Sequence, residues 1–348
     1  MILTSVLTLL VFLVTFFGTR SFIGWSRRRN ILDIPNERSS HTEPVPVGAG
    51  IFIAISVLAA FAARTYFGQA IYGGSFPGNL SAAYLAGGCG IAAISWLDDV
   101  KGVNVAIRFA VHSACAALVI FAVFRDVAQF VAFGWIFVPL TLLWIVGLTN
   151  AYNFMDGIDG IAGVQGGLAG LGWALTGYLL GDPLLSSLGS FVCISCIAFL
   201  LFNREPAKVF MGDVGSAFLG FTLSASALLA LAGRSSDGLA AAGFWPLMLM
   251  AVSFVWPFVF DSSFTFARRV INGEKVWLPH RSHLYQRMVR AGRTHTNVTI
   301  VYGSLALFTG GIAIVSGGQL SFTLPALAVV ASILLWLGFD PGNIASVE

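Results

Sequence analysis

Residues 137–160, FVPLTLLWIVGLTNAYNFMDGIDG, join two contrasting kinds of sequence. The first half is a largely apolar run. The second half holds two asparagines, Asn150 and Asn153, and two aspartates, Asp156 and Asp159. Apolar runs of about 18 or more residues are long enough to cross the ~30 Å hydrocarbon core of a bilayer as a helix. The stretch therefore predicts a membrane-spanning helix that ends in a strongly polar turn.

The composition of the whole chain extends this prediction to the rest of the sequence. Of its 348 residues, 57% are hydrophobic and only 10% are charged. Soluble domains are about half apolar and about a quarter charged. A helix satisfies its own backbone polar groups inside lipid, where water is absent. We therefore predict an all-α, polytopic integral membrane protein, with one transmembrane domain over residues 1–348 and no soluble domain.

Hydropathy predicts about eleven membrane spans. They cover roughly residues 2–24, 48–68, 80–97, 105–124, 130–149, 158–181, 184–203, 214–233, 242–264, 297–316 and 320–339. Because successive loops alternate between the two sides, the 19 Lys and Arg divide unevenly, and only Arg64, Arg125 and Arg234 fall on one side. Cytoplasmic loops are enriched in Lys and Arg. We therefore expect the N-terminus outside and the C-terminus in the cytoplasm.

Five loops share the predicted cytoplasmic face and hold most of the ionisable residues. They contain RRRNILDIPNERSSHTEPVPVGAG, SWLDDVKG, NAYNFMDGIDG, FNREPAKVFMGDVGS and RRVINGEKVWLPHRSHLYQRMVRAGRTH. Oxygens of Asp and Asn are hard ligands that suit Mg²⁺ or Ca²⁺, and Arg suits a phosphorylated anion. Carboxylates, a hard metal and cationic side chains together are typical of phosphoryl transfer. Since no soluble nucleotide-binding domain is predicted, we expect one substrate to be a lipid.

Each motif also has a structural interpretation that the sequence leaves open. SWLDDVKG suits a solvated turn with Lys101 as an ion-pair partner, and FMGDVGS suits a helix N-cap, since Asp213 precedes an apolar run. The basic loop around PHRSH suits a segment that lies on anionic lipid headgroups. It is less typical of a zinc site, because no second Cys or His pair matches it. His112 lies within the predicted span at 105–124 and is given no role.

The order of the loop motifs resembles one enzyme family. LDDVKG, NAYNFMDGIDGIAG, FNREPAKVFMGDVGSAFLGF and PHRSHLYQRM are similar to motifs of the polyprenyl-phosphate N-acetylhexosamine-1-phosphate transferases. That superfamily includes undecaprenyl-phosphate GlcNAc-1-phosphate transferases and phospho-MurNAc-pentapeptide translocases. The resemblance extends from about residue 33 to the PHRSHLYQRM loop and covers most of the chain. The form HRSHLYQ is similar to the branch that initiates O-antigen and capsule synthesis, whereas translocases usually have consecutive histidines here.

The resemblance implies a reaction at the cytoplasmic surface of the bacterial inner membrane. A UDP-N-acetylhexosamine and undecaprenyl phosphate would give undecaprenyl-diphospho-sugar and UMP. This is the first membrane step of a cell-surface polysaccharide such as the O antigen of lipopolysaccharide. The family requires Mg²⁺ or Mn²⁺ as its cofactor. We expect no nucleic acid partner, and the sequence leaves the identity of the sugar and the existence of a homodimer open.

The resemblance also implies a role for each motif residue. Asp98 and Asp99 would be the catalytic pair, one of which would deprotonate or position the lipid phosphate, while Asp213 and Asp156 would hold the metal. The residues implied to bind substrates are Asn153, Asp159, Asn203, Phe210, Arg108, His280, Arg281 and His283. Asp261 also matches the family pattern, without a defined role.

Two positions depart from the family pattern. The family often has a basic residue and two glycines after PxP, where this chain has PVPVGAG with Val47 and Ala49. A loop that contacts substrate would thus lack one cation, and the sugar or nucleotide preference would differ. Lys101 also lies one position closer to the aspartate pair than in translocase-like members. Arg108 is therefore the better candidate for the cation at the catalytic pair.

The sequence leaves other functions open. Within the family, the alternative is a phospho-MurNAc-pentapeptide transferase. A CDP-alcohol phosphatidyltransferase would need an Ala-Arg pair after Asp-Gly, which DGIDGIAG lacks. The non-enzymatic alternative is a membrane transporter, which predicts ionisable groups near the bilayer midplane and two related halves. The acids here cluster at one face instead, and the sequence shows no internal repeat.

Overall fold

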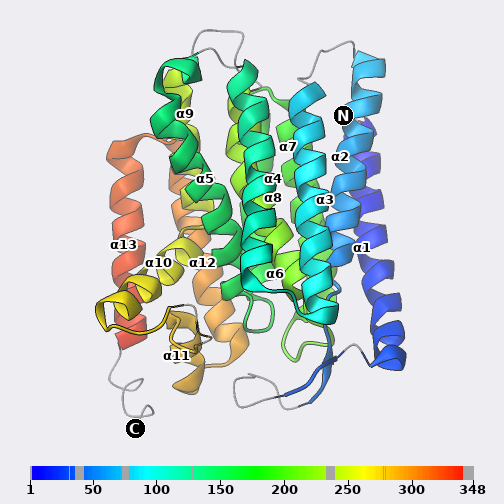
Figure 1. The fold of residues 1–348 in the computed structure, drawn as a ribbon, viewed down its shortest axis with the longest axis vertical. Coiled ribbons are helices and arrows are strands. Elements are labelled where there is room, and N and C mark those ends of the chain that lie inside the picture. Colours follow the sequence, from blue (N-terminus) through cyan, green and yellow to red (C-terminus); the bar gives the residue numbers. More distant parts are fainter. Residues whose placement is uncertain are drawn as a thin grey trace.

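The long apolar stretches form a bundle of helices that run along the height of the molecule (Figure 1). The computed structural model describes residues 2–30, 32–35, 43–72, 78–126, 129–232, 240–276, 278 and 280–339. The long helices are α1 Ile2–Arg29, α2 Ile51–Tyr72, α3 Gly78–Lys101, α4 Val105–Asp126, α5 Gln129–Met155, α6 Ile161–Leu179, α7 Pro183–Asn203, α8 Gly212–Ala232, α12 His295–Val315 and α13 Leu320–Phe339. This arrangement confirms the prediction of an all-helical, polytopic membrane protein.

Shorter elements complete the described part of the chain. They are α9 Ala240–Phe254, α10 Trp256–Ile271, α11 Leu284–Arg290, and the two-residue strands β1 Leu32–Asp33 and β2 Val45–Pro46. The strands pair antiparallel, with Leu32 opposite Pro46. Residues 36–42, which belong to the first predicted cytoplasmic loop, lie outside the described residues.

Within the described residues, nine helices are long and apolar enough to cross a bilayer, and the number becomes ten if α9 and α10 together make one crossing. The predicted span at 158–181 corresponds to α6. This helix is long enough to cross but is not among the nine, since its six glycines and Gln165 lower its hydropathy. A total of eleven spans therefore stays a prediction.

The predicted span at 242–264 is not one continuous helix. The axes of α9 and α10 differ by 81° across the break at Val255. Pro257 explains the break, because proline lacks an N–H and its ring clashes with the carbonyl four residues earlier. Neighbouring helices satisfy the carbonyls at the break. Thr309 Oγ1 donates to the carbonyl of Ser253 at 2.7 Å, and Gln165 Nε2 donates to that of Phe254 at 2.6 Å.

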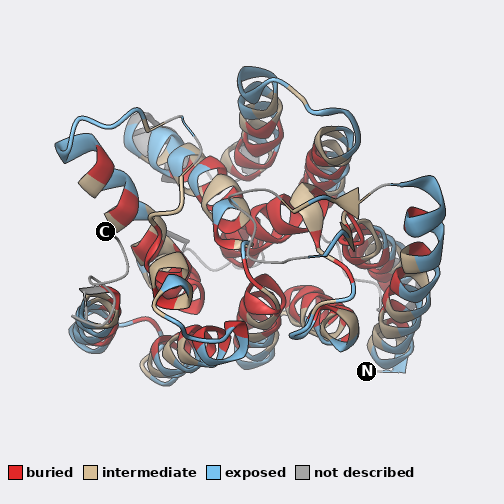
Figure 2. Cartoon of the chain, turned by 90° about the horizontal axis from the view of Figure 1, so that it is seen from below, coloured by how far each residue is buried: buried red, intermediate tan, exposed pale blue. Residues whose placement is uncertain are grey.

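The centre of the bundle is α8, in which every residue from Val214 to Ala232 is buried. Figure 2 views the lower end of the molecule and shows buried residues gathered at the centre and exposed ones on the outer helix faces. Close packing of α6 on α7 depends on glycine, since a Cβ at Gly170 would lie 2.7 Å from the backbone nitrogen of Cys193. Small residues allow membrane helices to approach closely in this way.

The polar loops after α1, α3, α5, α7 and α10 all lie at the lower end of the molecule (Figure 1). Contacts between them connect distant parts of the chain. Val47 pairs with Phe210, and Tyr285 Oη donates to the carbonyl of Phe154 at 3.2 Å. Five loops that are far apart in sequence therefore form one polar surface on an apolar bundle.

Candidate functional site

The Asp99 carboxylate lies at the start of α8. Its Oδ1 accepts from the backbone N–H of Asp213 at 2.8 Å, and its Oδ2 accepts from that of Val214 at 3.1 Å. The first N–H groups of a helix have no partner within the helix and carry partial positive charge. Asp99 therefore caps α8 from a neighbouring helix and fixes the backbone that carries Asp213.

Arg108, in the first turn of α4, joins two further carboxylates. Its Nη1 donates to Asp98 Oδ2 and, at 2.7 Å, to Asp213 Oδ2. The other Asp98 oxygen accepts from the backbone N–H of Val103 at 2.6 Å. The structure thus brings Asp98, Asp99, Asp213 and Arg108 together, as the sequence predicts. Lys101 is exposed at the end of α3, which agrees with the choice of Arg108 as the cation.

Asp156 follows the last residue of α5 and lies near the same group. Burial, followed by the nearby charges of Asp213, Asp99 and Asp159, raises its pKa from 3.8 to about 8. Asn153, one turn earlier, lies near the side chain of Asp213 and favours its ionised form. A carboxyl group in this position holds its proton near neutral pH because burial, and then the neighbouring negative charges, disfavour its ionised form.

Asp98, Asp99, Asp156 and Asp213 together form an acidic group. This acidic group has the donor chemistry of a metal site. Across the described ranges, no three His, Cys, Asp or Glu side chains are placed to ligate one ion in the arrangement shown. Arg108 occupies the space between Asp98 and Asp213, and α8 takes both oxygens of Asp99. The oxygens of Asp213 and Asp156 are hard donors that suit Mg²⁺. Burial and three nearby carboxylates raise the pKa of Asp156, and a cation bound there would favour its ionised form.

A glycine-rich contact forms one side of the acidic group. The N–H of Phe210 donates to the carbonyl of Pro46 at 2.8 Å, and that of Gly50 donates to Met211 at 2.9 Å. Gly212 has φ +74°, and a Cβ there would lie 2.6 Å from Asp99 Oδ2 and 2.8 Å from the Cα of Gly48. Only glycine fits such a position.

The two residues at which this chain departs from the family pattern lie in this contact. Val47 forms a parallel bridge with half-buried Phe210, and Ala49 is fully buried. The 46–50 segment is therefore held by backbone pairing beside the acidic group. Its side chains supply no charge to that group.

Asn203 and Asp159, which the sequence predicts to bind substrate, have partners within the protein. Buried Asn203 accepts from the N–H of Gly160 at 3.0 Å and donates to the carbonyl of Val209 at 2.9 Å. Asp159 Oδ2 accepts from the N–H of Ala207 at 3.1 Å. These bonds connect the turn after α5 to the loop after α7, so both residues shape the site.

His295, a residue without a predicted role, completes this connection. Its Nδ1 lies 3.4 Å from Asp159 Oδ2, and Glu205 Oε1 accepts from its backbone N–H at 3.3 Å. The only sequence signal for His295 is its place in the fifth cytoplasmic loop, because the partners that define its role lie elsewhere in the chain.

The histidine loop after α10 reaches the turn after α5. His280 Nδ1 lies 2.8 Å from Ser282 Oγ, and the rings of His280 and His283 are 4.9 Å apart. Burial, followed by the nearby His283 and Arg269, lowers the pKa of His280 to about 4, so its imidazole is neutral at pH 7. The neighbouring Arg281 is half-buried. The loop thus offers neutral and cationic donors of the kind that bind phosphate oxygens.

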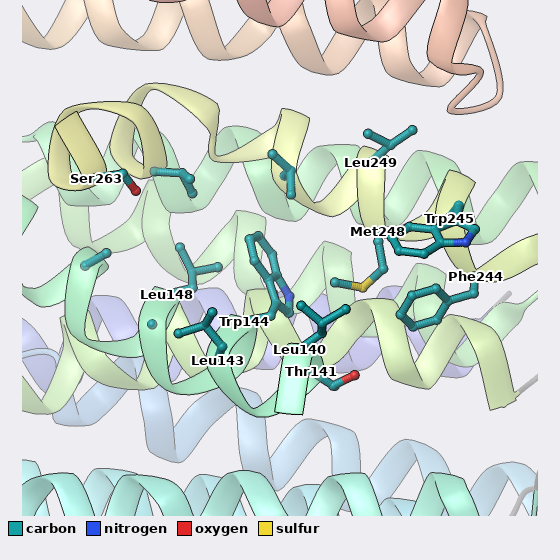
Figure 3. Close-up of a pocket in the computed structure, with 14 residues that line it drawn as sticks. Leu140, Thr141, Leu143, Trp144, Leu148, Phe244, Trp245, Met248, Leu249 and Ser263 are labelled. Carbon is teal, nitrogen blue, oxygen red and sulfur yellow. The ribbon is translucent and has the colours of Figure 1, made fainter. Parts of the chain in front are cut away.

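An apolar cavity of about 470 Å³ lies between α5, α9 and α10 (Figure 3). Trp144 and Leu148 line it from α5, Met248 lines it from α9, and Val259 lines it from α10. The same α5 continues to Asn153 and the Asp156 turn. The bend between α9 and α10 shapes this cavity, and α5 leads from it to the acidic group.

Comparisons with known proteins agree with the motifs. The family model described as glycosyl transferase family 4 matches residues 81–231. A probable undecaprenyl-phosphate N-acetylglucosaminyl 1-phosphate transferase of Bacillus subtilis is 30% identical over 285 residues, covering 78% of this chain and 73% of that protein. A decaprenyl-phosphate N-acetylglucosaminephosphotransferase of Mycolicibacterium smegmatis is 26% identical over 363 residues, covering 92% and 85%. A phospho-N-acetylmuramoyl-pentapeptide-transferase of a Synechococcus species is 42% identical over 124 residues, covering 35% and 31%.

Proposed function

The chain belongs to glycosyl transferase family 4, together with polyprenyl-phosphate N-acetylhexosamine-1-phosphate transferases, and we propose that it transfers an N-acetylhexosamine 1-phosphate from a UDP-sugar to undecaprenyl phosphate. The products are undecaprenyl-diphospho-sugar and UMP. One observation carries this proposal. Asp98, Asp99, Asp213 and Arg108 meet at one end of an apolar bundle.

In the proposed reaction, an oxygen of the lipid phosphate attacks the phosphorus that carries the sugar. The bond from that phosphorus to UMP breaks, and UMP leaves with the electron pair. Arg108, which bonds Asp98 and Asp213, would bind a phosphate oxygen of the substrate. We assign the role beside the lipid phosphate to Asp98, because Arg108, the proposed phosphate-binding cation, bonds Asp98 directly, whereas both oxygens of Asp99 bond the backbone of α8.

The cofactor we propose is Mg²⁺ or Mn²⁺, held by Asp213 and Asp156. When bound, the ion would stabilise negative charge on the phosphate oxygens. Asn153 lies near Asp213 and favours its ionised form. His280, Arg281 and His283 would contact the diphosphate of the UDP-sugar from the other side of the Asp156 turn.

The apolar cavity supports a position for the polyprenyl chain. Its lining comes from α5, α9 and α10, and α5 ends at the acidic group. A chain of isoprene units is apolar throughout, so its burial there is favourable at about 25 cal/mol per Å². The acceptor would lie along α5 with its phosphate at Arg108.

We propose an inner-membrane location with the polar loops in the cytoplasm, since most Lys and Arg lie in them. Eleven crossings, with α6 and the α9–α10 pair each counted as one, would place the N-terminus outside and the C-terminus inside. The form HRSHLYQ favours a GlcNAc-type donor for a surface polysaccharide such as O antigen. The match to a phospho-N-acetylmuramoyl-pentapeptide-transferase over 124 residues keeps that donor as the second candidate.

A panel of labelled UDP-sugars tests this function. Membranes that contain the protein are given undecaprenyl phosphate, Mg²⁺ and either UDP-GlcNAc, UDP-GalNAc or UDP-MurNAc-pentapeptide. We expect UMP and labelled lipid from a UDP-N-acetylhexosamine, and neither product without undecaprenyl phosphate. If UMP is released only from UDP-MurNAc-pentapeptide, the result would favour a phospho-N-acetylmuramoyl-pentapeptide transferase. If no donor yields UMP, the proposed transferase activity is contradicted.

A further inference from the structure

The buried carboxylate of Asp261 connects three helices. Asp261 lies in α10 and is fully buried. It accepts five hydrogen bonds, from the N–H groups of Leu284 at 2.8 Å and Tyr285 at 3.1 Å, from Thr265 Oγ1 at 3.1 Å, from Tyr302 Oη at 2.7 Å and from His283 Nδ1 at 3.3 Å. These donors come from α10, from the start of α11 and from α12. The carboxylate therefore sets where α11 begins.

The contact with His283 determines which ring nitrogen carries a proton. A carboxylate accepts hydrogen bonds but does not donate them, so Nδ1 of His283 must be the donor. This leaves Nε2 as the nitrogen for other partners. The ring also contacts the rings of His280 and Tyr285, at centroid distances of 4.9 and 5.8 Å. Both its orientation and its tautomer are thus restrained.

Helix α11, whose start is bonded to Asp261, also contacts the end of α5 next to Asp156. Tyr285, whose N–H donates to Asp261, donates its own hydroxyl to the carbonyl of Phe154, two residues before Asp156. His283 therefore has a defined place relative to the turn after α5. A change at Asp261 would alter the histidine without touching Asp98, Asp99 or Asp213.

We propose that Asp261 is a positioning residue that acts through His283. It keeps Nδ1 protonated so that Nε2 faces the diphosphate of the bound UDP-sugar. This inference rests on the proposed function. Outer partners of this kind orient a functional histidine, and their loss typically costs about 10–100-fold in affinity or activity.

The variant Asp261→Asn separates positioning from helix capping. Asparagine caps a helix about as well as aspartate, but it lacks the negative charge that holds the proton on Nδ1 of His283. We expect the KM for the UDP-sugar to rise about tenfold or more, while the KM for undecaprenyl phosphate stays within about twofold. Tyr302→Phe is the matched control, because it removes one donor to the same carboxylate and leaves the histidine contact.

A double-mutant cycle tests whether Asp261 acts through His283. We expect Asp261→Asn to have little further effect in a His283→Ala background, since residues that act through one contact are not additive. A further loss of about tenfold in that background would overturn the proposal. Equal losses for Asp261→Asn and Tyr302→Phe would also overturn it.

A spectroscopic readout keeps this test independent of turnover. In ¹⁵N-histidine NMR of the whole protein, His283→Ala identifies the signal, and wild-type His283 in its neutral form should be the Nδ1–H tautomer. An Nε2–H tautomer would overturn the proposal, even if Asp261→Asn failed to fold. If no UDP-sugar were turned over, the proposed function would fail, and this spectrum would still decide the contact between Asp261 and His283.

Discussion

Asp98 and Asp99 are neighbours in the chain, but their carboxylates have different partners. Asp99 bonds the backbone at the start of α8, while Asp98 bonds Arg108. Successive residues of a helix point about 100° apart, so the sequence predicts unlike roles for the pair. It does not predict which residue has which role, because the partners lie on α4 and α8. At the residue scale, the site depends on these pairings.

Removal of the Asp213 charge tests the centre of these pairings. In Asp213→Asn, Arg108 loses an ionic partner and the proposed metal loses a ligand. We expect turnover to fall by about 100-fold or more, while the melting temperature in detergent stays near that of the wild type.

Asp182→Asn serves as the matched control for Asp213→Asn. Asp182 Oδ1 accepts from the N–H groups of Leu184 and Leu185 at the start of α7, and asparagine caps equally well. We expect its activity to match the wild type. Near-normal turnover of Asp213→Asn would contradict the role of Asp213.

The raised pKa of Asp156 predicts a pH-dependent stability. The folded chain binds a proton at Asp156 more tightly than the unfolded chain between about pH 4 and pH 8, so this residue destabilises the fold increasingly as pH rises through that window. Asp156→Asn removes the effect. Without metal or nucleotide, its melting temperature should exceed that of the wild type at pH 8.5, and the difference should shrink toward pH 5.

Two outcomes of this titration are informative. A constant difference in melting temperature across the window would contradict the raised pKa of Asp156. If Asp156 is a metal ligand, Mg²⁺ should stabilise the wild type more than Asp156→Asn at pH 8.5, because only the wild type gains a neutralised carboxylate.

At the scale of the elements, the lengths of the apolar runs predicted where the helices lie. Pro257 breaks one of these predicted helices into two. The predicted span at 242–264 became α9 and α10, bent by 81°. Gln165 and Thr309 bond the carbonyls at the break, but no local sequence pattern shows that they do so. The cavity between α5, α9 and α10 follows from this bend.

A larger side chain in the cavity tests its proposed role. Gly147 on α5 lines it, and a Cβ there would meet nothing within 4 Å. Gly147→Phe should raise the KM for undecaprenyl phosphate about tenfold and leave the KM for the UDP-sugar unchanged. A short-chain polyprenyl phosphate should be less affected, since it needs less of the cavity.

Gly311→Phe provides the same change at another exposed glycine. A Cβ at Gly311 on α12 also meets nothing within 4 Å, and this residue does not line the cavity. Its kinetics should match the wild type. Equal KM values for undecaprenyl phosphate in both variants would argue against the cavity as the site of the lipid chain.

The contact between α11 and the turn after α5 requires a glycine at 157. A Cβ at Gly157 would collide with the hydroxyl of Tyr285, which donates to Phe154. Gly157→Ala should therefore reduce kcat/KM for the UDP-sugar several-fold. Tyr285→Phe in the same chain should restore part of the loss, because it removes the colliding oxygen. No rescue by the second change would indicate that Gly157 acts through its backbone conformation.

At the scale of the whole molecule, five loops form one polar end of the bundle (Figure 1). Alternation of spans and the distribution of Lys and Arg predicted this grouping, although a single error in the span count would have reversed part of it. Contacts such as those between Asp99 and α8, or between Phe154 and Tyr285, join loops that the sequence separates by more than 100 residues.

The proposed orientation is tested with single cysteines in a background without the four native cysteines. Lys275→Cys lies at the polar end, and Tyr178→Cys lies at the other end of α6; both positions are exposed. An impermeant maleimide should label residue 178 in intact cells and residue 275 only in inverted vesicles. The reverse pattern would overturn the orientation.

The sequence by itself determined the helical membrane class, the shared face of the polar loops and the hard-oxygen chemistry of the site. These properties depend on apolar length, loop charge and residue type, which are local or additive along the chain. Only the tertiary structure decided that Asp99 caps α8, that Arg108 bridges Asp98 and Asp213, and that Asp261 holds His283. Each of these needs a partner on another helix, and helix packing alone determines which side chains come within bonding distance.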